Sequence, residues 1–140
     1  MGTGAMCDPY NPFEEQEQLT RHSLELLDAF EFGVHALTKS SLIARDADIF
    51  CSIAEHSPVL CQVTVTAAED SLSALVEPNV SSTSERFEAI AKMSENGLFT
   101  GIVMTPLLPF IEDTEENVLG IVRMAKECGA RSVYPMFGLT

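Results

Sequence analysis

The sequence predicts an α/β fold, a partial (β/α) barrel with about five parallel strands and four or more helices. Apolar segments of strand length alternate with segments of helical period along the whole chain. The strand candidates recur every 26 to 40 residues, roughly the spacing of βα units, whose right-handed crossovers make neighbouring strands parallel. A complete eight-unit barrel needs about 200 residues or more. The 140 residues of the chain are therefore expected to form a single domain over 1–140, as part of a barrel or as an open sheet.

The first unit begins with small residues that end in the polar pair Cys7 and Asp8, as at the end of a strand. Asn11, Pro12 and Glu14 then match an N-cap, a first-turn proline and a capping-box acid. We expect the acids at 14, 15 and 17 to be solvated and to stabilise the helix dipole. An apolar stripe at helical spacing follows and is expected to face the core: Leu19, Ser23, Leu26, Leu27 and Phe30.

The remaining units repeat this order of strand, polar strand end and helix. Asp46 is expected to cap the second helix, and Ser82 with Glu85 forms a capping-box pattern at the start of the third. Asp113 with Glu116 is expected to open the last helix. The further strands are predicted over 34–39, 58–66, 98–106 and 132–137.

Composition limits the classes of function. The chain has 21 acidic and 8 basic residues, a formal net charge of −13, and it has no Lys/Arg cluster, so we expect no nucleic-acid partner. Its four cysteines lack metal-ligand spacing, which suggests reduced thiols in a cytoplasmic protein. Because no apolar run reaches about 18 residues, no membrane span is predicted.

Polar residues gather where the predicted strands end. Cys7 and Asp8 follow the first strand, Lys39 ends the second and Thr64 lies near the end of the third. The carboxyl ends of parallel strands share one edge, and α/β proteins bind their ligands at that edge. We therefore expect a small-molecule site there.

Five segments, in this order and spacing, resemble the spore photoproduct lyase-like radical SAM proteins. They are Gly-Ala-Met-Cys-Asp-Pro-Tyr-Asn-Pro, Leu-Thr-Lys-Ser, Val-Thr-Val-Thr, Glu77-Pro78 with the later Ser-Glu-Arg86-Phe-Glu-Ala-Ile, and Gly101 to Pro106. The resemblance spans essentially the whole chain. It implies a partial (β/α)6 barrel that holds S-adenosylmethionine against a [4Fe-4S] cluster, and reductive cleavage that yields a 5′-deoxyadenosyl radical.

The same resemblance implies roles for five residues. Lys39 stands where the family has a lysine that contacts S-adenosylmethionine, and an ammonium can pair with the methionine carboxylate. Thr64 replaces a cofactor-contacting serine and keeps a hydroxyl. Cys7 and Asp8 stand at a strand-end hydroxyl position and at the family's aspartate, and Cys7 is also a candidate thiol donor in catalysis. Arg86 matches too, early in a helix.

Two departures qualify this resemblance. The family's Cys-x-x-x-Cys-x-x-Cys cluster loop is expected upstream of Met1, and no such triplet occurs in the chain. Ala5 stands where the lyase has its hydrogen-donor cysteine, which argues against DNA as the substrate. We expect the first βα unit of the barrel to be missing and the chain alone to be inactive. The open sheet edge that results is expected to promote self-association.

Two classes of function remain. One is part of a radical SAM enzyme, and the other is a non-catalytic βα module that binds a small ligand or a partner chain. An unrelated hydrolase or aldolase with Lys39 as a Schiff-base lysine is a weaker third, because no second base is placed to activate the amine.

Overall fold

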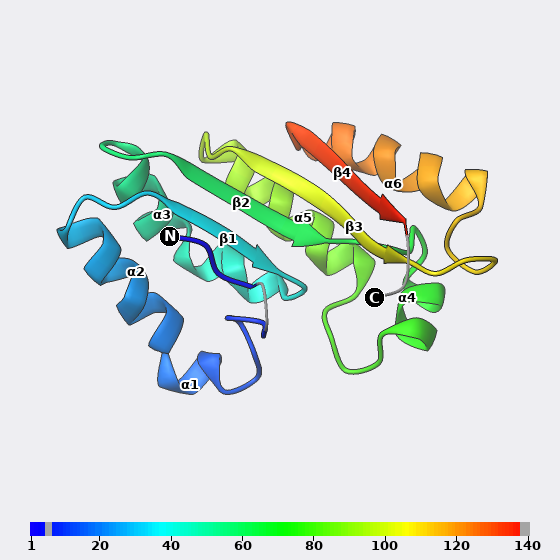
Figure 1. The fold of residues 1–140 in the computed structure, drawn as a ribbon, viewed down its shortest axis with the longest axis horizontal. Coiled ribbons are helices and arrows are strands. Elements are labelled where there is room, and N and C mark those ends of the chain that lie inside the picture. The colour runs from blue at the N-terminus through cyan, green and yellow to red at the C-terminus, as the bar shows by residue number, and fades with distance from the viewer. Residues whose placement is uncertain (5–6, 138–140) are drawn as a thin grey trace.

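The computed structural model describes residues 1–4 and 7–137. One sheet contains four parallel strands in the order β1-β2-β3-β4, which confirms the α/β prediction (Figure 1). The elements are α1 (Glu14–Glu17), α2 (Leu19–Ala29), β1 (Val34–Thr38), the 3-10 helix η1 (Ser41–Asp46), α3 (Ala47–Ala54), β2 (Val59–Thr64), α4 (Asp70–Val76), α5 (Thr83–Glu95), β3 (Thr100–Leu107), α6 (Glu115–Glu127) and β4 (Ser132–Phe137).

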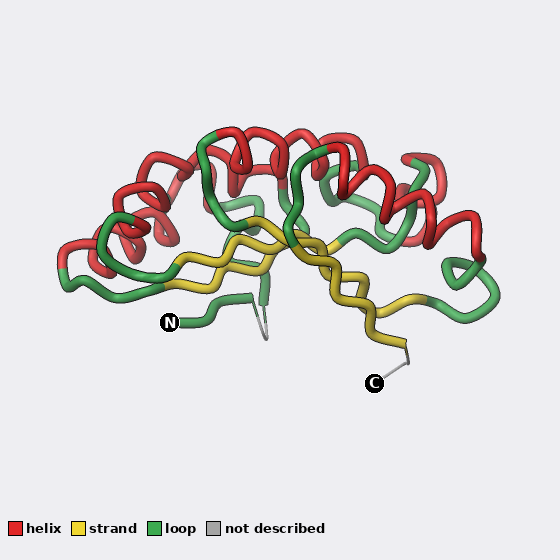
Figure 2. Tube along the Cα trace, turned by 90° about the horizontal axis from the view of Figure 1, so that it is seen from above, coloured by secondary structure: helices red, strands yellow, loops and turns green. Residues whose placement is uncertain are grey.

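The helices form a single layer over one face of the sheet (Figure 2). Alternate strand residues point into the core beneath the helices, as the two-residue period of a strand requires. The buried strand residues include Val34, Ala36, Cys61, Val63, Ile102 and Met104, which share one cluster with Phe50, Ile53, Phe87, Ile90, Met93 and Ile121 of the helices. A one-sided helix layer is the arrangement expected of part of a (β/α) barrel.

Among the described residues the expected first strand is represented by a single bridge, and residues 5 and 6 of that prediction lie outside them. The sheet has four strands where about five were predicted. Gly2 pairs in parallel with His35 of β1, the Thr3 N–H donates to the His35 carbonyl at 2.9 Å, and the His35 N–H donates to the Met1 carbonyl at 2.8 Å. Gly4 then turns the chain with φ +87°, and a Cβ there would lie 2.0 Å from the Leu37 carbonyl oxygen. Only glycine fits this close approach, because a side chain would meet the backbone of β1.

The start of the first helical segment also differs from the prediction. Phe13, not Asn11, is the N-cap of α1, and the Asn11 Oδ1 accepts a hydrogen bond from the Phe13 N–H at 3.0 Å in a turn. Glu14 is buried at 3% exposure rather than solvated. Its carboxylate accepts hydrogen bonds from the backbone N–H groups of Thr20 at 2.9 Å and Arg21 at 3.3 Å. Glu14 therefore caps the start of α2, where N–H groups lack intrahelical partners.

Most of the predicted apolar stripe of α2 faces solvent, and of its leucines Leu27 packs against the core. Leu19, Leu26 and Phe30 are 66%, 62% and 71% exposed, whereas Leu24 is buried. The opposite side of α2 carries polar residues that bond to α3: Asp28, for example, accepts from the Ser52 hydroxyl at 2.8 Å. The side of α2 that faces the core and α3 thus combines Leu24 and Leu27 with polar contacts such as this one.

The later helices follow the sequence more closely. Ser82 and Glu85 form the predicted capping box of α5. The N-cap of α6 is Thr114, one residue beyond the predicted Asp113, and its hydroxyl accepts from the Asn117 N–H at 3.3 Å. Asp46 precedes α3 as predicted, but its carboxylate makes no cap hydrogen bond. The short helix α4 was not predicted.

Candidate functional site

A cavity of about 380 Å³ opens where β1, β2 and β3 end. Its lining residues are Gly4, Cys7, Asp8, Leu37, Thr38, Lys39, Thr64 and Thr105. Four of the five residues predicted for the cofactor site, Cys7, Asp8, Lys39 and Thr64, therefore line one cavity. Arg86 is absent from this lining, and Ala5 lies outside the described residues.

Asp8 fixes the loop after the N-terminal segment to the end of β1. Its Oδ1 accepts from the Thr38 hydroxyl at 2.5 Å and from the Tyr10 N–H at 2.9 Å, and its Oδ2 accepts from the Lys39 N–H at 2.8 Å. Three donors thus hold the Asp8 carboxylate in the cavity wall.

Lys39 follows β1 directly, and its side chain is held by Glu77. The Lys39 ammonium forms an ion pair with the Glu77 Oε1, and the two side chains are 36% and 13% exposed. Burial opposes ionisation of Glu77, but hydrogen bonding and charge from Lys39 and Arg86 outweigh this effect and lower its pKa. The sequence had marked Glu77 only as part of a family-like motif, because its partners lie far away along the chain.

Arg86 lies behind the cavity wall, buried at 1% exposure. Its Nη1 donates to the Thr64 carbonyl at 2.8 Å, its Nε donates to the Ser81 carbonyl at 2.8 Å, and its Nη2 donates to the Glu77 Oε2 at 2.9 Å. The planar guanidinium thereby connects β2, the loop before α5 and the residue that holds Lys39. The predicted cofactor contact of Arg86 stays a prediction, and the observed contacts are structural.

The two remaining predicted residues differ in accessibility. Thr64 is buried at 4% exposure, whereas Cys7 is an exposed free thiol. Thr105 of β3 joins them in the lining, a residue that the sequence had placed only at a strand end. Hydroxyl and thiol groups from three segments thus meet in one cavity.

A second cavity, of about 370 Å³, shares Asp8 and Lys39 with the first. Its other lining residues are Tyr10, Asn11, Pro12, Glu15, Ser40, Ser41, Leu42, Asn79, Val80 and Ser81. Asp8 and Lys39, which are hydrogen-bonded to each other, therefore lie between the two cavities.

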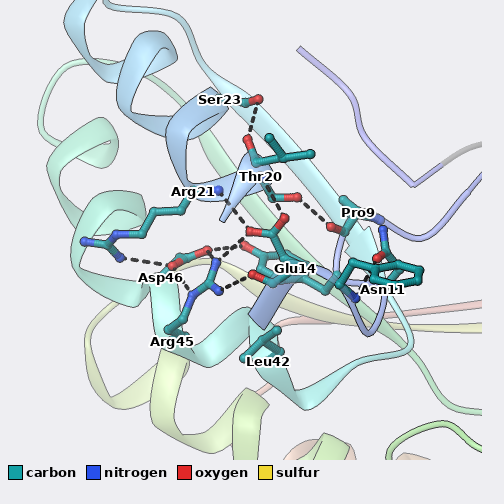
Figure 3. A network of polar contacts seen from close by, with 12 residues as sticks. Pro9, Asn11, Glu14, Thr20, Arg21, Ser23, Leu42, Arg45 and Asp46 are labelled. Carbon is teal, nitrogen blue, oxygen red and sulfur yellow. Dashed lines mark hydrogen bonds and ion pairs between the residues drawn. The ribbon is translucent and has the colours of Figure 1, made fainter. Parts of the chain in front are cut away.

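A partly buried ionic network lies beside the loop that follows Asp8 (Figure 3). The Arg45 Nη2 donates to the Glu14 Oε1 at 2.9 Å, the Arg21 Nη1 donates to the Asp46 Oδ1 at 3.0 Å, and the Tyr10 hydroxyl donates to the Asp46 Oδ2 at 3.1 Å. Burial opposes ionisation of Glu14, but hydrogen bonds from the Thr20 N–H and from Arg45 overcome this effect and lower its pKa. Burial, with Asp46 nearby, raises the pKa of Tyr10. The network thereby holds this loop against η1 and α2.

The described residues include neither a metal-ligand cluster nor a membrane-spanning helix. No group of three or more His, Cys, Asp or Glu side chains in 1–4 and 7–137 could hold a metal ion. Across the same residues, the helices are all too short or too polar to cross a membrane.

Comparison with known proteins gives relatives without an assigned function, and no family model matches the chain. An uncharacterized protein of Methanocaldococcus jannaschii is 31% identical over 111 residues, which is 79% of this chain and 41% of that protein. An uncharacterized protein of Acidianus two-tailed virus is 29% identical over 133 residues, covering 91% of this chain and 42% of the relative. An uncharacterized protein of Mycobacterium tuberculosis strain H37Rv is 26% identical over 136 residues, covering 97% of this chain and 40% of that protein. The chain thus spans about two fifths of the length of these relatives.

A solved structure is similar over most of the chain. It is a spore photoproduct lyase double mutant with bound AdoMet and dinucleoside spore photoproduct, with a TM-score of 0.60 and 17% sequence identity. The match covers 91% of this chain and 34% of the lyase chain. The similarity establishes the fold. Four parallel strands under one helix layer correspond to part of the lyase's structure.

Proposed function

We propose that this chain is the S-adenosylmethionine-binding part of a radical SAM enzyme of the spore photoproduct lyase-like family. The observation that carries the proposal is the cavity at the ends of β1 to β3, where Asp8 and Lys39 lie in one wall. The similar structure, a lyase solved with bound AdoMet, supports it. Four of the residues predicted from the sequence line this one cavity.

The charges of the cavity suit the head group of the cofactor. The methionine part of S-adenosylmethionine carries a carboxylate and an ammonium on one carbon atom, so a site that recognises it needs a cation beside an anion. Lys39 and Asp8 supply these charges, and Thr64 and Thr105 add hydroxyl groups that can donate or accept hydrogen bonds. Lys39 would take the carboxylate and Asp8 the ammonium. Cys7, exposed in the same lining, is the candidate thiol donor.

The [4Fe-4S] cluster does not fit the residues of this chain. The cysteines stand at 7, 51, 61 and 128, far apart in sequence, and Cys61 is fully buried. Burial raises the pKa of Cys61 to about 12, which disfavours the thiolate that would ligate iron. In the proposed enzyme the cluster, which supplies the electron for cofactor cleavage, would be held by cysteines outside this chain.

The alternative is a non-catalytic βα module that binds a small amino-acid-like ligand or a partner chain. The cation and anion of the cavity are complete within the chain, so binding of such a head group requires no cluster. With its strong negative charge the chain is poorly suited to bind nucleic acid, and four free cysteines suit a cytoplasmic protein.

Calorimetric titration of the chain with S-adenosylmethionine tests the proposal. S-adenosylhomocysteine, methionine and ATP are the comparison ligands. Selective binding of S-adenosylmethionine supports the cofactor site, equal binding of free methionine supports the alternative, and binding of neither amino-acid ligand contradicts the proposed site.

Lys39→Ala should weaken S-adenosylmethionine binding about tenfold, because the ligand carboxylate loses a charged hydrogen-bond donor. Lys92→Ala is the matched control, since Lys92 is an exposed lysine of α5 outside the cavity. Equal affinities for the two variants would remove Lys39 from the site.

A further inference from the structure

We infer that Glu77 and Arg86 are positioning residues that hold the Lys39 ammonium at the cavity for the carboxylate of a ligand. The inference rests on the proposed function and assigns a role to two residues outside the cavity lining. Its basis is a continuous chain of contacts from Arg86 through Glu77 to Lys39.

A lysine at this place needs such support. Its side chain is flexible, and holding it in one geometry costs rotamer entropy. Lys39 is 36% exposed, so packing alone leaves its ammonium mobile. The ion pair with Glu77 restricts the ammonium before any ligand arrives, so less entropy is lost on binding.

Glu77 can do this because its two oxygens have separate partners. The Oε1 pairs with Lys39, and the Oε2 accepts from the Arg86 Nη2 at 2.9 Å. Arg86 is itself fixed, because it is fully packed and also donates to the Thr64 and Ser81 carbonyls. One guanidinium thus sets the relative position of Lys39 after β1 and of Thr64 at the end of β2.

Arg86 also affects the net charge of the Lys39–Glu77 ion pair. Lys39 and Glu77 alone would neutralise each other and attract a carboxylate weakly. Arg86 adds a second cation, so the three residues together carry one net positive charge beside the cavity. The Lys39 ammonium has three donors, so it can keep Glu77 and still donate to a ligand carboxylate.

The Glu77→Gln variant tests whether Glu77 positions Lys39 or only competes with the ligand for the Lys39 ammonium. If Glu77 positions Lys39, the variant binds S-adenosylmethionine more weakly, on the order of fivefold, because the ammonium is no longer held. If Glu77 only competes with the ligand for Lys39, the added net positive charge makes the variant bind more tightly, and the inference is overturned. Glu69→Gln is the matched control, an exposed acid whose side chain makes no cap hydrogen bond at the start of α4.

A second readout does not depend on the ligand. NMR relaxation of the lysine ε-methylene groups should show Lys39 more restricted than Lys92 in the wild-type chain, and equally mobile in Glu77→Gln. Arg86→Lys, which keeps the charge but lacks the three separate nitrogens of the planar guanidinium, should mobilise Lys39 too if the variant folds. Unchanged restriction of Lys39 in Glu77→Gln would overturn the inference. If wild-type S-adenosylmethionine binding is absent while the restriction follows Glu77, the proposed function fails and the positioning contact stands.

Discussion

The buried carboxylate of Glu14 joins three segments that surround the candidate site. It caps α2 through the N–H groups of Thr20 and Arg21, and it pairs with Arg45 of η1. The same arginine donates to the Glu14 carbonyl at 3.0 Å. Because Pro9 and Tyr10 lie in the loop that this network holds, Glu14 contributes to placing Asp8 without touching the cavity.

Glu14→Ala should lower the free energy of unfolding by about 3 kcal/mol, because Arg45 would be left partly buried without this partner and α2 would lose its cap. Urea denaturation measures the change. Glu15→Ala is the control, since Glu15 is exposed beside it and its loss should cost within about 0.5 kcal/mol. Similar stabilities of the two variants would show that the Glu14 contacts add nothing to folding.

The sheet has two edges, and they differ. Beside β1, Met1 to Thr3 occupy part of the edge with two backbone hydrogen bonds to His35. Beyond β4, no further strand pairs within the described residues. Tyr134 and Met136 of β4 are 56% and 44% exposed. We therefore propose that self-association, expected first at the N-terminal edge, occurs through β4, where unpaired backbone groups and apolar side chains coincide.

Tyr134→Lys should shift the chain toward monomer in sedimentation velocity at high concentration, because a lysine on an edge strand opposes pairing with another strand. The wild-type chain should sediment faster as its concentration rises. Leu75→Lys, at an 80% exposed position of α4 away from the sheet edge, serves as the control and should behave as wild type. A wild-type chain that stays monomeric at every concentration would refute the proposal.

Folding lowers the pKa of several carboxyl groups across the molecule. Protein contacts lower the pKa of Glu14 and Glu77, and also those of Asp28, Asp48 and Asp70. A lowered pKa in the folded state adds stability above the unfolded pKa, and this stability is lost as pH falls through the folded value. Tyr10 has the opposite sign: its raised pKa adds stability below the unfolded value, which is lost as pH rises past about 10.

Stability measured by urea denaturation should therefore be greatest near neutral pH and decrease as pH falls from about 5 toward 3, where acids become protonated in the unfolded chain first. Salt near 0.5 M, roughly enough to screen the repulsion of the acidic surface, isolates these local contacts. The Glu77→Gln variant should lose less stability over this range than wild type. A wild-type unfolding midpoint that does not change between pH 5 and pH 3 would contradict this account.

Local patterns predicted much of the fold. Alternating strand and helix signals identified β1 to β4, because buried parallel strands read as short apolar runs and their order follows the right-handed crossover. The capping box of α5 was visible because its partners lie three residues apart. The site residues Cys7, Asp8, Lys39 and Thr64 were predicted from strand ends and from the family resemblance, and their proximity follows from the common edge of parallel strands.

Long-range contacts decided what the sequence could not. The exposed stripe of α2 and the burial of Glu14 depend on partners in η1 and α3, more than 20 residues away in sequence, and no local period reports such partners. The same holds for Glu77 and Arg86, because their contacts with Lys39 and Thr64 are formed only in the folded chain. By itself the sequence determined the class of fold and the edge that bears the site, because periodicity and strand ends are local properties. Only the tertiary structure decided which charges are paired, since pairing depends on distances between elements.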